Sequence, residues 1–111
     1  MTPPELEQPP LRPVMDGVLS LSLRSRTQPF KGVDEWQEIT VEESFPCAET
    51  ALLLCDVWND HPCEGAVVRL DKMLPRMNEV VVALRARGVQ IVHAPSDTME
   101  VYADTPYRLR A

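Results

Sequence analysis

The sequence lacks every signal for a membrane span or for export. It contains no run of about 18 apolar residues, the length that a transmembrane helix requires. Its first residues are acidic and rich in proline, whereas a secretory signal has a basic region followed by an apolar core. We therefore expect a cytoplasmic protein that does not bind a membrane.

The two common phosphate-binding patterns are also missing, since neither GxGxxG nor GxxxxGK[ST] occurs. Basic residues are in the minority, with 11 Lys and Arg against 17 Asp and Glu, for a net charge of −6. Nucleic-acid binding relies on a basic surface that displaces counterions, so this balance argues against a nucleic-acid partner.

Cysteine is scarce, and its spacing fits no common framework. The chain has three cysteines, Cys47, Cys55 and Cys63, an odd number with no CxxC pair, so neither a disulfide scaffold nor a zinc site is indicated. Cys55 lies within an apolar run and is predicted to be a small core residue. Cys47 and Cys63 flank the predicted strand ends and are expected to be exposed thiols.

The N-terminal half of the chain predicts a tail followed by a β segment. The first thirteen residues hold five prolines and little apolar bulk, so we expect residues 1–17 to form a disordered tail. Residues 18–24 and 38–42 each alternate apolar and polar side chains, the period of a half-buried strand. The β segment 18–45 is thus predicted to be an antiparallel hairpin with a long loop, at the edge of a sheet.

Residues 50–95 predict a strand–helix–strand unit. The run ALLLCD at 51–56 is typical of a strand buried on both faces of a parallel sheet. From Ala66 the apolar residues recur every three or four positions, as on one face of a helix, and Gly88 precedes a second apolar strand at 89–94. Because Pro75 interrupts the pattern, we predict a short helix over 65–73 and a longer one beginning near Leu74.

A βαβ unit has parallel strands, and ligands bind beyond their carboxyl ends. Asp56 stands at one such end and the stretch from His93 to Asp97 stands at the other. Two parallel strands do not close a domain. Either the N-terminal strands complete the sheet or residues 18–111 are an incomplete domain, and we expect the second.

Two segments resemble the start of the isochorismatase-like cysteine hydrolases, the superfamily that includes the nicotinamidases. They are TALLLCDVWNDH and PRMNEVVVALRARGVQIVHAPSDT, and the order and spacing of their residues carry the resemblance. It implies the N-terminal part of a doubly wound, Rossmann-like parallel sheet in a three-layer α/β fold, here preceded by a short β segment.

The resemblance also implies a site. Members of the family use an aspartate to deprotonate a cysteine thiol that attacks an amide carbonyl, while a lysine helps to hold the charge. Asp56 matches the aspartate, but neither Lys31 nor Lys72 matches the lysine, and no cysteine of the chain stands at the nucleophile's place. The chain is therefore expected to be the N-terminal portion of a hydrolase acting on a C–N bond of a small amide, and to be inactive alone.

Around Asp56, the residues Trp58, His61 and His93 are candidates to line the substrate pocket. Asp97 aligns with an aspartate that binds a divalent metal in nicotinamidases, but Met99 stands where the accompanying histidine would be. No cofactor is therefore expected. Two alternatives stay open: a non-catalytic family member that binds a small molecule or a protein, and a structural module that forms a homo-oligomer through an incomplete sheet edge.

Overall fold

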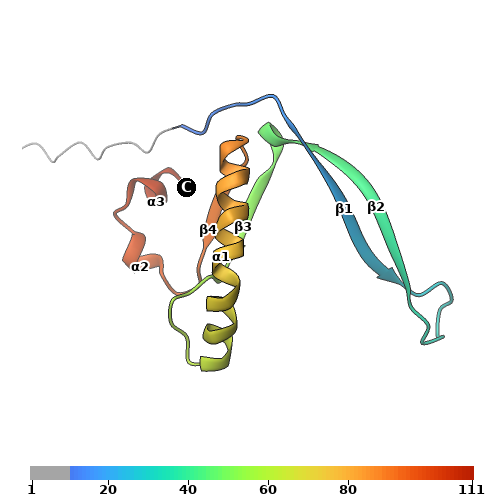
Figure 1. The fold of residues 1–111 in the computed structure, drawn as a ribbon. Helices are drawn as coiled ribbons and strands as arrows, with labels where there is room; N and C mark the ends of the chain where they lie inside the picture. Colours follow the sequence, from blue (N-terminus) through green and yellow to red (C-terminus); the bar gives the residue numbers. More distant parts are fainter. Residues whose placement is uncertain (1–10) are drawn as a thin grey trace, which may run out of the picture.

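The computed structural model describes residues 11–111, and the first ten positions of the predicted tail lie outside the described residues. The chain is a mixed α/β protein. The described residues hold one antiparallel strand pair, one parallel strand pair, three α-helices and a short 3-10 helix at Cys47–Glu49 (Figure 1).

The predicted antiparallel hairpin is confirmed. Strands β1 (Val18–Thr27) and β2 (Gln37–Pro46) pair in one unbroken register, and both extend beyond the predicted ranges. Most side chains on one face of the hairpin are polar, and on this face Nη1 of Arg24 lies 3.8 Å from Oε2 of Glu38. In Figure 1 the hairpin projects away from the rest of the molecule.

The predicted parallel strand pair is also confirmed. Strands β3 (Ala51–Cys55) and β4 (Gln90–Ala94) pair in parallel, and helix α1 (Glu64–Ala86) connects them and runs alongside the pair (Figure 1). Gly88 has a φ of 83°, a left-handed conformation that lets the chain turn sharply from the helix into β4.

The predicted break at Pro75 is wrong. Helix α1 runs as a single element through Pro75, although a proline removes one backbone hydrogen bond and crowds the preceding turn. The helix has 23 residues, so its many other backbone hydrogen bonds maintain the helix on both sides of that position.

The hairpin and the parallel pair are two separate sheets. The prediction that the hairpin lies at the edge of a larger sheet is therefore wrong for the described residues, and so is the alternative in which β1 and β2 complete the parallel sheet. Strand β3 is not buried on both faces either, since Leu53 is 60% exposed.

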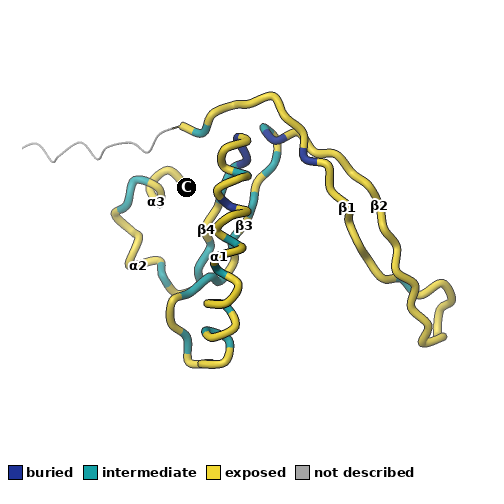
Figure 2. Tube along the Cα trace, viewed as in Figure 1, coloured by how far each residue is buried: buried dark blue, intermediate teal, exposed yellow. Residues whose placement is uncertain are grey.

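The small core lies where the hairpin meets the parallel pair. Leu19, Cys47 and Val89 are buried there, with Leu52, Leu84 and Ile91 packed against them (Figure 2). Residues 11–17 form no helix or strand, but the Arg12 guanidinium donates hydrogen bonds to the Gly88 and Ala48 carbonyls beside this core.

Two cysteine predictions are corrected by this core. Cys47 is completely buried rather than exposed, and its Sγ would lie 3.4 Å from a Cβ placed on Gly17. Cys55 is exposed rather than buried, because its strand has an open face. Cys63 is exposed, as predicted.

The C-terminal segment contains two short helices that its sequence pattern did not indicate, α2 (Met99–Tyr102) and α3 (Pro106–Arg110). The side chain of Thr105 accepts a hydrogen bond from the Arg108 N–H, which caps the start of α3. Within residues 11–111, no helix is both long enough and apolar enough to cross a membrane.

Candidate active site at the carboxyl end of strand β3

Asp56 is the first residue after β3, and its backbone leaves the extended conformation of the strand. Its φ is 57°, in the left-handed region that aspartate adopts more readily than most side chains. Its N–H still donates to the Ala94 carbonyl at 3.2 Å, which extends the parallel ladder by one bond. The backbone of Asp56 is thus fixed to the end of β4.

Ser96 holds the Asp56 carboxylate. The backbone N–H of Ser96 donates to Oδ1 of Asp56 at 2.9 Å, and the Ser96 hydroxyl donates to the same oxygen at 2.5 Å. Both bonds reach across from the turn after β4, forty positions further along the chain. They leave the second carboxylate oxygen, Oδ2, outside this pair of bonds.

These contacts lower the pKa of Asp56 from its ordinary value of 3.8. The Ser96 hydroxyl contributes most and the Ser96 N–H next, because both stabilise the charged carboxylate. Partial burial opposes the shift in pKa, and the Cys55 thiol and the charge of His61 add to it. Asp56 is therefore an ionised carboxylate at neutral pH.

The loop after Asp56 brings two of the predicted pocket residues into contact. The rings of Trp58 and His61 stack with their centroids 4.5 Å apart and their planes at 20°. The Cys63 N–H donates to Nδ1 of His61 at 3.0 Å, which fixes the orientation of the imidazole ring. The pair forms a half-buried aromatic wall beside the strand end.

The remaining candidates lie on β4 and in the turn that follows it. His93 is an exposed residue of β4, paired in register with Leu54. Asp97 is exposed and has a φ of 58°, the same left-handed conformation as Asp56. Among residues 11–111, no three His, Cys, Asp or Glu side chains are grouped closely enough to hold a metal ion, so Asp97 does not join a ligand set there.

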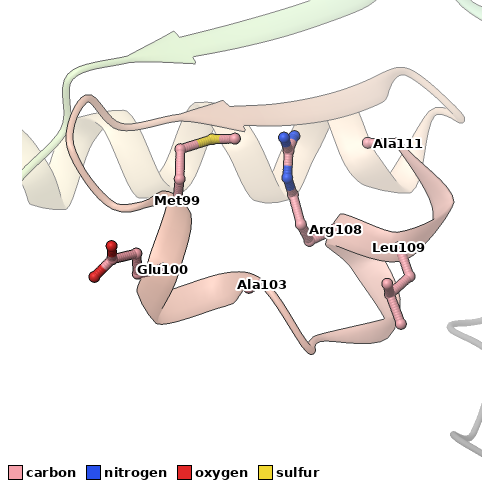
Figure 3. A pocket seen from close by; sticks show the side chains of 6 residues that line it. All are labelled: Met99, Glu100, Ala103, Arg108, Leu109 and Ala111. Atoms are coloured by element: carbon pink, nitrogen blue, oxygen red, sulfur yellow. The ribbon is translucent and has the colours of Figure 1, made fainter.

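A separate hollow of about 580 Å³ lies between α2, α3 and the end of the chain. It is lined by Met99, Glu100, Ala103, Arg108, Leu109 and Ala111. Figure 3 shows the Met99 and Arg108 side chains pointing toward β4, while Glu100 and Leu109 point away. No residue predicted for the pocket around Asp56 lines this hollow.

Ser96 is a residue of this site that sequence reasoning missed. Its position in a Pro-Ser-Asp turn directly after a predicted strand was the available signal, since serine side chains often bind nearby polar groups in turns.

No protein-family model matches the chain, and neither does any curated protein or solved structure. A functional assignment therefore depends on the residues of the chain and on their geometry.

Proposed function

We propose that Asp56 is the general base of an isochorismatase-like hydrolase site that cleaves a C–N bond of a small amide. In this proposal the β3–α1–β4 unit is the first part of a doubly wound parallel sheet with helices on both faces. The lysine and the cysteine of the site then belong to later strands, outside these 111 residues.

The observation that carries the proposal is the held carboxylate at the end of β3. Ligands of parallel α/β sheets bind beyond the carboxyl ends of the strands. Asp56 is fixed at such an end through its backbone and through both Ser96 donors. A base must be ionised to accept a proton, as an aspartate is at neutral pH, and the Ser96 bonds fix the position of this carboxylate. Oδ2 is the oxygen that takes the proton, because Oδ1 already accepts two bonds.

The proposed chemistry begins when Asp56 takes the proton of the cysteine thiol, and the thiolate forms a bond to the amide carbonyl carbon. The C–N bond breaks, Asp56 returns the proton to the leaving amine, and water then hydrolyses the thioester. Lys31 lies in the loop between β1 and β2 and Lys72 lies on α1, so neither provides the lysine of this scheme at the strand end.

The test is an amide hydrolysis assay on two proteins, the 111-residue chain and the same chain extended by the reading frame that follows it. We expect no turnover from the chain alone, because it lacks the nucleophile. We expect turnover from the extended protein, reduced at least about 100-fold by Asp56→Asn. Asp71→Asn, on the exposed side of α1, is the matched control and should leave the rate unchanged.

Two results would contradict the proposal. One is turnover by the chain alone that Asp56→Asn abolishes, because the nucleophile would then lie within these residues; the exposed Cys55 beside Asp56 would be the first thiol to replace. The other is an active extended protein whose rate does not depend on Asp56.

The second candidate is a non-catalytic member that binds a small molecule or a protein. The stacked Trp58–His61 pair favours it, since an aromatic wall beside an ionised carboxylate is suited to hold a planar, hydrogen-bonding ligand. If the extended reading frame has neither a lysine after the third strand nor a cysteine after a later strand, this candidate is favoured over the enzyme.

A further inference from the structure

The β1–β2 hairpin has one apolar side, and that side is largely uncovered. Leu21 and Leu23 are each 41% exposed, and Ile39 and Val41 on the same side of β2 are 44% and 45% exposed. Val41 lies opposite Leu23, whereas Leu21 lies opposite Glu43. Of the apolar residues on this side, only Leu19 at the base of the hairpin is buried. Isolated two-stranded hairpins are marginal in water, and three or more strands are the usual requirement for stability.

The two outer edges of the hairpin differ in their charges. Strand β1 has no acidic residue and no proline, and its unbroken register leaves its far edge without a bulge. Strand β2 carries Glu38, Glu42 and Glu43 and ends at Pro46. Charged side chains and prolines are the means by which natural sheets block an edge. The charges of β1 are confined to Arg24 and Arg26, so its stretch at 18–23 has neither a charge nor a proline and is the less protected edge.

We propose that β1 is a dimerisation strand, which pairs antiparallel with β1 of a second copy of this chain around a two-fold axis at Leu21. The two hairpins then form one four-stranded antiparallel sheet in the order β2, β1, partner β1, partner β2. An interface of this kind is isologous, so one strand must be complementary to itself.

Strand β1 meets that requirement. With Leu21 opposite the partner's Leu21, Leu19 lies opposite the partner's Leu23, and all these leucines share one side of the sheet. On the other side, Ser20 lies opposite the partner's Ser22. A slip of one residue would bring leucines opposite serines and divide the apolar side between the two faces.

Charge also favours this register. Asp16, just before β1, comes opposite the partner's Arg26, so each end of the interface pairs an acidic with a basic residue. Val18 lies opposite the partner's Arg24, and no two like charges face each other. A second copy is therefore the occupant that β1 fits, whereas a strongly basic partner strand would face Arg24 and Arg26 across this edge.

The test compares two double variants of the full chain by analytical ultracentrifugation. Ser20→Lys with Ser22→Lys places lysine opposite lysine twice across the proposed interface, and should weaken dimerisation at least about tenfold. Within the hairpin these lysines face only Ser44 and Glu42, which tolerate them. Gln37→Lys with Ser44→Lys adds the same charge to β2, opposite Thr27 and Ser20, and should leave the dimer intact.

Intermolecular nuclear Overhauser effects in a mixture of labelled and unlabelled chain identify the contact itself. The expected contacts join the Leu19 and Leu23 methyl groups of different copies. A chain that stays monomeric at all concentrations would overturn the proposal, as would equal weakening by both double variants. A dimer whose contacts join Leu53 or Val92, on the open side of the parallel pair, would also overturn it.

Discussion

At the residue scale, Asp56 shows what the sequence pattern predicts and what it omits. The apolar run before it predicts a strand, and its place at the carboxyl end of that strand follows directly. The bonds from Ser96 were not predictable from the pattern, because they depend on where a turn forty positions away comes to lie. The contact between Trp58 and His61 depends in the same way on the fold of a loop.

Removing the charge of Asp56 should make the free energy of unfolding depend less on pH in the acid range. The folded-state pKa of Asp56 lies below its unfolded value, so its contribution to stability is present above about pH 4 and is lost as the pH falls through the folded pKa. Asp56→Asn keeps the left-handed backbone, which asparagine also tolerates.

The measurement for this variant is the urea midpoint between about pH 5 and about pH 2. The wild-type midpoint should fall more steeply than that of Asp56→Asn over this range. Parallel curves for the two proteins would show that Ser96 does not stabilise the charged carboxylate.

Gly88 is the glycine whose replacement should cost most. Its φ is 83°, and an added Cβ would lie 2.9 Å from the Pro13 carbonyl oxygen and 3.3 Å from the Met15 side chain. Gly32 is a matched control, with a φ of 85° but nothing within 4 Å of an added Cβ.

Gly32→Ala should therefore lower the free energy of unfolding by the backbone cost alone, about 1–2 kcal/mol. Gly88→Ala should lower it further, because residues 13–15 must also move. Thermal or urea unfolding measures both changes, and equal losses would show that the N-terminal segment does not pack against Gly88.

At the scale of elements, most of the strands and helices were predictable because each repeats a simple period. The alternation in β1 and β2 and the apolar runs of β3 and β4 predicted all four strands and their pairing. The short helices α2 and α3 were not predictable, since each spans about one turn and is too short to show a helical period.

Pro75 is the clearest conflict between local preference and the observed element. Replacing it by alanine restores a backbone donor within α1 and relieves the crowded turn, so Pro75→Ala should raise the free energy of unfolding by up to about 3 kcal/mol. Pro106→Ala is the control, because Pro106 opens α3, a position that proline favours.

Urea unfolding followed by circular dichroism measures both proline variants. A loss of stability in Pro75→Ala would mean that the proline is required for the path of α1, and would contradict its assignment as a strained interior position.

At the scale of the whole molecule, the assembly of the elements was the least predictable level. The Cα radius of gyration is 19.2 Å, against about 13 Å for a compact domain of this length. Local periods do not specify which sheets join, so the separation of the hairpin from the parallel pair and the open face at Leu53 appeared only in the structure.

The central claim is that Ser96 holds Asp56 as an ionised carboxylate at the end of β3, and ¹³C NMR titration of the Asp56 carboxyl carbon in the whole chain tests it most directly. We predict a pKa below 3.8 in the wild type, a rise toward that value in Ser96→Ala, and no change in the control Thr98→Ala, whose hydroxyl donates instead to the Pro95 carbonyl. A wild-type pKa at or above 3.8 that Ser96→Ala leaves unchanged would contradict the claim.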